Sequence, residues 1–122
     1  MVNSRQKGKV GERNLARKLS ELLAPVRRGQ QFSGIGGADV VGLQGIHVEC
    51  KYTNTLRLSQ AMQQSVCDAG EDVPIVCHKR SREDWLLTVR LDDILRLLGA
   101  LNVIVEANQH RPEKSEEEAS GA

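Results

Sequence analysis

Four side chains that can be charged near neutral pH lie within residues 36–53, a stretch that is otherwise mostly apolar or small. They are Asp39, His47, Glu49 and Lys51. Two carboxylates beside an amine could bind a divalent cation and stabilise negative charge on a substrate. Whether they can act together depends on the strands that carry them.

The segment Ile46–Tyr52 has the strict alternation of a half-buried β-strand. Its apolar side chains face one side, and its polar side chains, His47, Glu49 and Lys51, face the other. At roughly 3.3 Å per residue, Glu49 and Lys51 project together about 7 Å apart. The alternative is an exposed strand face that carries a salt-bridged pair. We expect His47 to be a surface residue at the end of this strand.

Two carboxylates fall where the pattern predicts burial. Asp39 opens an apolar strand, residues 39–43, directly after a glycine-rich bend. Glu12 lies on the apolar stripe, spaced by three and four, of a predicted first helix over residues 5–24. A buried carboxylate needs a partner or a cation. For Glu12 the alternative is a first-turn acid that favours the helix dipole.

A cation would be needed if Glu12, Asp39 and Glu49 converge. Unit charges about 5 Å apart repel by roughly 3 kcal/mol at an effective dielectric near 20. Oxygen ligands without a histidine or thiolate pattern favour magnesium or manganese over zinc. With Lys51 beside such a site, the chemistry indicated is phosphodiester hydrolysis, in which metal and lysine activate and orient a water.

The connection between the two strands decides whether Asp39 can meet Glu49. A plain two-residue hairpin at residues 44 and 45 would set Asp39 opposite Cys50, with its side chain pointing away from the Glu49 face. We therefore expect an odd-length connection, either a three-residue loop with Gly45 at positive φ or a bulge near Asp39. A regular two-residue turn without a bulge would exclude the metal site.

The whole pattern predicts a single α/β domain over residues 1–106, with a mixed sheet flanked by helices. Strands are expected at residues 25–32, 39–43, 46–52, 73–78 and 85–90, and helices at residues 5–24, 58–69 and 92–98. Residues 107–122 are acidic and small, and they predict a disordered tail.

Charge is distributed unevenly along the chain. Residues 1–30 carry eight basic and two acidic side chains, a net +6, whereas residues 106–122 carry two basic and five acidic side chains, a net −3. The basic front predicts nucleic acid as partner, although a solvated basic helix face is equally common. The candidate DNA contacts are Arg5, Lys9, Arg13, Arg17, Arg27, Arg28, Lys79, Arg80 and Arg82. Gln60 and Gln64, one helical turn apart, could face the same site.

These residues carry a family resemblance. The segments GADVV (residues 37–41) and VECK (residues 48–51) resemble the PD-(D/E)XK nuclease signature, and Glu12 is similar to the first-helix acid of that superfamily. The resemblance covers roughly residues 7–89 and is nearest to archaeal-type Holliday junction resolvases and small phage endonucleases. Ala38 departs from it, because the family often has proline there.

The resemblance implies a restriction-endonuclease-like α-β-β-β-α-β core. It implies that Asp39, Glu49 and the backbone carbonyl of Cys50 bind Mg²⁺, with Mn²⁺ as a substitute. It further implies that Lys51 positions the water and that Glu12 supports the metal shell. Ser33 would contact the scissile strand.

The expected protein is a magnesium-dependent DNA endonuclease, selective for branched DNA such as Holliday junctions. Since one site cuts one strand, symmetric cleavage would require a homodimer. The alternatives are a catalytically inactive nucleic-acid-binding subunit with this fold, another phage or restriction-type DNA nuclease, and an interaction module with a surface salt-bridge cluster.

Composition excludes several other classes. No run approaches the roughly 18 apolar residues of a membrane span, so we expect a soluble, cytoplasmic protein that does not engage a membrane. Its three cysteines have no C-x-x-C spacing, which argues against a disulfide framework or a zinc site and predicts reduced, buried thiols. One Trp, one Tyr and one Phe are too few for a binder that stacks on single strands.

Overall fold

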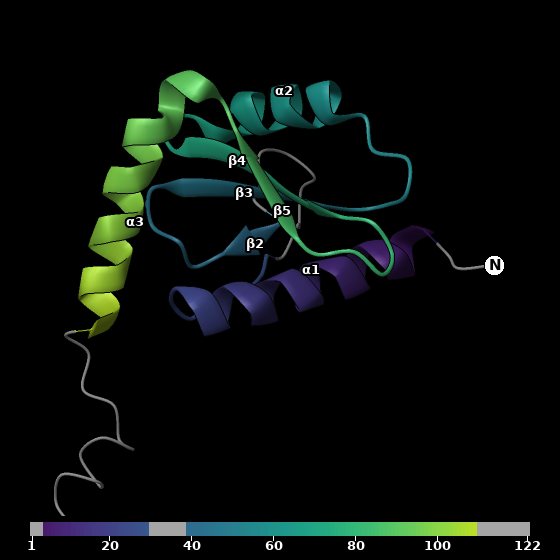
Figure 1. Cartoon of the computed structure of the whole chain (residues 1–122), viewed down its shortest axis with the longest axis horizontal. Helices are drawn as coiled ribbons and strands as arrows, with labels where there is room; N and C mark the ends of the chain where they lie inside the picture. The colour runs from purple at the N-terminus through teal and green to yellow at the C-terminus, as the bar shows by residue number, and fades with distance from the viewer. Residues whose placement is uncertain (1–3, 30–38, 110–122) are drawn as a thin grey trace, which may run out of the picture.

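The computed structural model describes residues 4–29 and 39–109 and alternates helices with strands (Figure 1). The helices are α1 (Ser4–Leu22), α2 (Leu58–Ala69) and α3 (Ile94–Gln109), and a short 3₁₀ helix, η1 (Leu91–Asp93), precedes α3. The strands are β1 (Arg27–Arg28), β2 (Val40–Val41), β3 (Ile46–Tyr52), β4 (Val73–Lys79) and β5 (Leu86–Val89).

The strands form one five-stranded mixed sheet in the order β1-β2-β3-β4-β5. The pairs β1/β2, β2/β3 and β4/β5 are antiparallel, whereas β3 and β4 are parallel. Helix α2 makes the crossover that a parallel pair requires. The prediction of an α/β chain with a mixed sheet flanked by helices is therefore confirmed.

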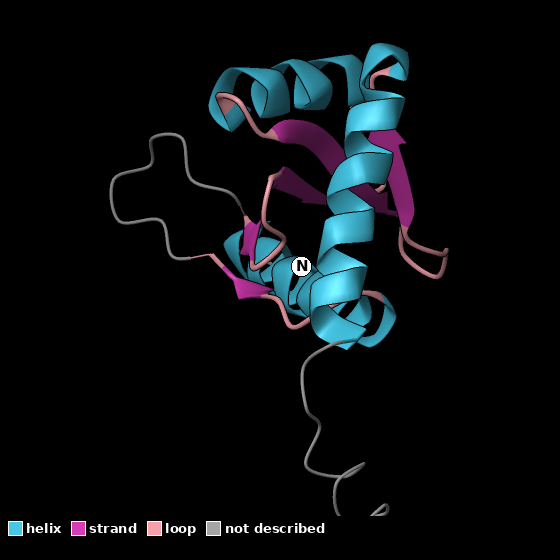
Figure 2. Ribbon diagram, turned by 90° about the vertical axis from the view of Figure 1, so that its left-hand side faces the viewer, coloured by secondary structure: helices cyan, strands magenta, loops and turns pink. Residues whose placement is uncertain are grey.

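The helices cover the two faces of the sheet unequally. Helix α1 lies on one face and α2 on the other (Figure 1), while α3 runs across one end of the strands (Figure 2). The main core fills the space between the sheet, α1 and α3, and includes Leu15, Leu19, Val40, Ile46, Val48, Val73, Ile75, Leu97 and Ile104. On the opposite face, α2 buries Ala61, Ser65 and Ala69, and the Ser65 hydroxyl donates to the Ile75 carbonyl at 2.9 Å.

Two regions differ from the expected boundaries. Strands β1 and β2 have two residues each, shorter than predicted, and residues 30–38 between them lie outside the described part. Helix α3 continues to Gln109, past the expected helix end at residue 98 and the expected domain end at residue 106. It does so because Ile104 is in the core and the Asn108 side chain donates to the Leu23 carbonyl at 3.2 Å. Residues 110–122 of the expected tail are outside the described residues.

Within residues 4–29 and 39–109, no helix is both long and apolar enough to cross a membrane.

Candidate active site

The connection between β2 and β3 has one residue more on the β2 side than a regular two-residue hairpin would have. The Ile46 amide donates to the Leu43 carbonyl at 3.1 Å and closes a tight turn. Continuing that register would pair Val40 with Glu49, yet Val40 pairs with Val48. Two residues on the β2 side thus lie opposite one on the β3 side, which is the arrangement of a β-bulge. The predicted departure from a plain two-residue hairpin is confirmed.

Two glycines make this connection possible. Gly45 has φ +82° in the turn, as expected, and Gly42 has φ +125° at the extra residue. A Cβ on Gly42 would lie 2.7 Å from the carbonyl oxygen of Pro25 and 2.9 Å from the Cα of Val26. Any residue with a Cβ would be strained in this backbone conformation, and its Cβ would collide with these atoms.

The Asp39 amide donates to the Val48 carbonyl at 3.1 Å, and the Asp39 side chain lies close enough to that of Glu49 for the two carboxylates to interact. The Cys50 amide donates to the Asp39 carboxylate at 2.9 Å. Burial raises the pKa of Asp39 to about 6, against the lowering effect of the Cys50 amide. Glu49 raises this pKa further by its charge and by a side-chain hydrogen bond. Glu12 also raises it by its charge. The three carboxylates that the sequence singled out therefore lie close enough to interact.

Glu12 reaches this cluster from α1. Its side chain is 20% exposed and accepts a hydrogen bond from Arg28 Nε at 2.7 Å. The preceding residue, Gly11, lets the helix approach β3, because a Cβ there would lie 2.6 Å from the Cβ of Tyr52. The ion pair with Arg28 explains how a carboxylate is accommodated on the inward stripe of α1.

His47 is buried, and the prediction of a surface histidine is wrong. It is only 4% exposed, and its Nε2 lies 2.9 Å from Oε1 of Glu49, itself 5% exposed. The reason is α2, which covers this end of the polar face; Asp68 on α2 has a carboxylate oxygen within 4.8 Å of both groups. The hydrogen bond to Glu49 raises the pKa of His47. Among the described ion pairs, Glu49 joins His47 rather than Lys51.

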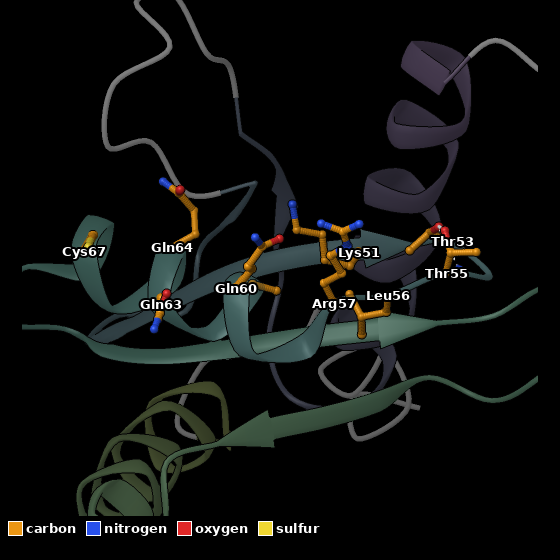
Figure 3. Close-up of a pocket in the computed structure, with 10 residues that line it drawn as sticks. Lys51, Thr53, Thr55, Leu56, Arg57, Gln60, Gln63, Gln64 and Cys67 are labelled. Atoms are coloured by element: carbon orange, nitrogen blue, oxygen red, sulfur yellow. Dashed lines mark hydrogen bonds between the residues drawn. The ribbon is translucent and has the colours of Figure 1, made fainter.

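Lys51 lies at the open end of the same face. It lines a cavity of about 630 Å³ between β3 and α2, which we call the Lys51 groove (Figure 3). The side-chain ends of Lys51, Gln60 and Gln64 point toward the same open side of this groove. Its other lining residues are Thr53, Thr55, Leu56, Arg57, Ala61, Gln63 and Cys67. The two glutamines that could face the site therefore do share a cavity with the lysine.

The basic residues expected to contact DNA are distributed over several elements. Lys9, Arg13 and Arg17 are exposed on α1, Arg27 is exposed on β1, and Arg80 and Arg82 are exposed between β4 and β5. Arg28 is paired with Glu12, and Lys79 lies 5.4 Å from the centre of the Tyr52 ring. Arg17 and Lys79 also line a second cavity of about 690 Å³, which does not include Lys51. The Arg5 side chain and Ser33 lie outside the described residues.

Sequence reasoning missed two polar residues of this region. Arg57, at the N-terminal boundary of α2, lines the Lys51 groove, and Asp68 accepts a hydrogen bond from Gln64 at 2.7 Å beside His47. Arg57 lies three residues before Gln60 and Asp68 four residues after Gln64. This helical spacing could have indicated that they lie on the same side of the helix as the two glutamines. The cysteines are all free, but only Cys77 is buried; Cys50 is half-buried and Cys67 is exposed, so the expectation of three buried thiols is wrong.

No protein-family model matches the chain, and no curated protein or solved structure matches it either.

The raised pKa of Asp39 should make the metal-free protein more stable at pH 5 than at pH 7.5. Because this pKa is about 6 in the folded protein against an ordinary 3.8, the folded state holds the proton more tightly, and stability falls as pH rises through 6. The two values correspond to about 1 kcal/mol over that interval. Urea unfolding with EDTA should show this difference in the native protein and a smaller one in Asp39→Asn. Equal differences would contradict the assignment.

Proposed function

We propose that this chain is a metal-dependent DNA endonuclease with a restriction-endonuclease-like core. The observation that carries the proposal is the bulged register, which brings Asp39 and Glu49 together on the face that also bears Lys51. Without the extra residue at Gly42, Asp39 would point to the opposite face. Gly42, with φ +125° and no room for a Cβ, permits this bulge.

The carboxylates fit a hard divalent cation. Asp39 is a half-buried acid beside another carboxylate. Its pKa is raised first by burial and then by the charges of Glu49 and Glu12, and a bound cation would favour its ionised form. Asp39, Glu49 and the backbone carbonyl of Cys50 would hold Mg²⁺, and Mn²⁺ would substitute. Bound there, the ion would supply a more acidic water and neutralise charge on the phosphate.

The chain's own groups would orient the reaction. The Cys50 amide fixes one carboxylate oxygen of Asp39, and His47 fixes one of Glu49. Lys51 projects from the same face as Glu49 with its amine in the groove, where it would hold the attacking water and a phosphate oxygen. Glu12, paired with Arg28, would support the metal shell from α1.

The Lys51 groove suits a nucleic-acid backbone. Arg57, Gln60, Gln64 and two threonines, Thr53 and Thr55, provide hydrogen-bond donors along it. Side chains of these types commonly donate hydrogen bonds to the phosphates of a nucleic acid. The groove therefore supports DNA as the proposed substrate. The preference for branched DNA and the cytoplasmic location belong to the proposal as expectations from the sequence.

The decisive experiment is cleavage of labelled four-way junction, linear duplex and single-stranded DNA, each with Mg²⁺, with Mn²⁺ and with EDTA. Native protein should cut only with metal, and Glu49→Gln should lose cutting by about a thousandfold or more. Glu21→Gln, an exposed residue of α1, is the matched control and should cut like the native protein.

Two results would overturn the proposal. DNA binding without cleavage by any metal would favour the rival, an inactive nucleic-acid-binding subunit. Absence of both binding and cleavage would favour an interaction module.

A further inference from the structure

Three side chains that commonly bind metals meet between β3 and α2. They are His47, Glu49 and Asp68, and their ligand atoms all lie within 4.8 Å of one another. His47 and Glu49 are next-but-one neighbours on β3, so they project from the same side of the strand. Asp68 meets them from the last turn of α2, which lies over that face of the sheet (Figure 1). One strand and one helix thus bring together an imidazole and two carboxylates, which we call the His47 cluster.

The spacing within the His47 cluster fits a shared cation. Nε2 of His47 lies 2.9 Å from Oε1 of Glu49. Two ligands that are each about 2.1 Å from one metal ion, at a right angle to each other, lie roughly 3 Å apart. The His47 and Glu49 atoms are therefore already spaced like neighbouring ligands of one ion. A small rotation of the Asp68 side chain would bring its carboxylate to the same ion.

The charges of the His47 cluster do not balance by themselves. The side chains of His47 and Glu49 are only 5% and 6% exposed. Glu49 and Asp68 carry one negative charge each when they are ionised, whereas His47 offers at most one positive charge. A divalent cation bound to a neutral imidazole and two carboxylates makes the net charge zero. Because buried charges are normally paired or bound to metals, the cluster favours a cation.

Neighbouring groups orient the cluster and leave a path to it. Gln64 donates to Oδ2 of Asp68 at 2.7 Å, and hydrogen bonds of this kind usually hold the carboxylate ligands of a metal in place. Gln64 also lines the Lys51 groove, and His47 lines a separate cavity of about 450 Å³ beside the turn between β2 and β3. The cluster is therefore bordered by two cavities, and a metal site needs such a path of entry.

We propose that the His47 cluster binds a divalent transition-metal cation of the Zn²⁺ class, at a site distinct from the proposed Mg²⁺ site. An imidazole nitrogen suits Zn²⁺ and Co²⁺, whereas Mg²⁺ prefers oxygen ligands. Three protein ligands also leave a position for water, as in many zinc sites. Sequence reasoning did not find this site because it expected His47 at the surface and because Asp68 belongs to another element.

The test is Zn²⁺ binding to the full chain, stripped of metal with EDTA and dialysed, by titration calorimetry with Mg²⁺ in excess. The native protein should bind one Zn²⁺ per chain, and Mg²⁺ should not compete. His47→Gln and Asp68→Asn should each weaken Zn²⁺ binding at least about tenfold. Zn²⁺ should also raise the melting temperature of the native protein more than that of either variant. No step of this test needs DNA, so the inference does not rest on the proposed function.

Two further variants separate the cluster from other ligands. His78→Gln removes a histidine that is bonded to Thr88 on β5, and it should bind Zn²⁺ like the native protein. Asp39→Asn removes a proposed Mg²⁺ ligand, so it should weaken Mg²⁺ binding and keep Zn²⁺ binding. Circular dichroism should show equal helix content in all the variants. If the buried His47→Gln fails to fold, the half-buried Asp68→Asn still decides the outcome.

Native Zn²⁺ affinity in both His47→Gln and Asp68→Asn would overturn the inference. So would loss of Zn²⁺ binding in Asp39→Asn alone, which would place the ion at the proposed Mg²⁺ site. With Co²⁺ in place of Zn²⁺, a thiolate charge-transfer band would assign the ion to the exposed Cys67 and contradict the cluster. Zn²⁺ binding as expected without any DNA cleavage would support this site while it refutes the proposed function, so the two failures can be distinguished.

Discussion

Lys51→Met should lower the rate of metal-dependent DNA cleavage by about a thousandfold. The amine lies two residues from Glu49 on the shared strand face, and it lines the groove where the substrate would lie. Methionine keeps most of the length of the side chain and removes its charge. Because Lys51 is not a proposed metal ligand, the affinity for Mn²⁺ should stay near the native value.

Single-turnover cleavage and a Mn²⁺ titration measure the two quantities separately. Arg57→Met is the matched control, since Arg57 lines the same groove but starts α2 rather than extending the Glu49 face. It should weaken DNA binding more than it slows the chemical step. Comparable cleavage by Lys51→Met and the native protein would remove Lys51 from the reaction.

Gly42→Ala should lower the free energy of unfolding by about 3 kcal/mol. The substitution places a Cβ within 2.7 Å of the Pro25 carbonyl oxygen at a residue with φ +125°, so the strand must shift. That shift would also separate Asp39 from Glu49, and we expect the cleavage rate to fall with stability.

Urea unfolding of Gly42→Ala beside Gly70→Ala provides the comparison. Gly70 also has positive φ, +59°, but nothing lies within 4 Å of an added Cβ, so this control should cost only about 1 kcal/mol. If the two variants were equally stable, the steric argument for the bulge would be incorrect.

The parts of the fold with a clear period were predictable. β3 begins at Ile46 and ends at Tyr52 as expected, because the alternation continues without interruption. Helix α2 likewise runs from Leu58 to Ala69, where Gly70 ends it at positive φ. The bulge was predictable for a different reason. Asp39 can share a face with Glu49 only if the connection departs from a plain two-residue hairpin by an odd number of residues.

Other features depended on contacts between distant elements. The alternation placed His47 on the polar face, but only the position of α2 decides that this end of the face is buried. Helix α3 looked short because Gly99 and Asn102 interrupt a run of apolar residues. Its true length depends on packing of Ile104 and on the contact of Asn108 with Leu23.

The two carboxylates of the site belong to strands of very different length. Glu49 is on β3, whose seven residues all pair with β4 in the middle of the sheet, whereas Asp39 precedes a two-residue strand. The short strand can detach by local opening while the central pair stays intact. We therefore expect Glu49 to stay in place when the short strand beside Asp39 opens. A cation bound by both Asp39 and Glu49 would be released when the short strand opens. Its rate of dissociation would therefore depend on how often that strand opens.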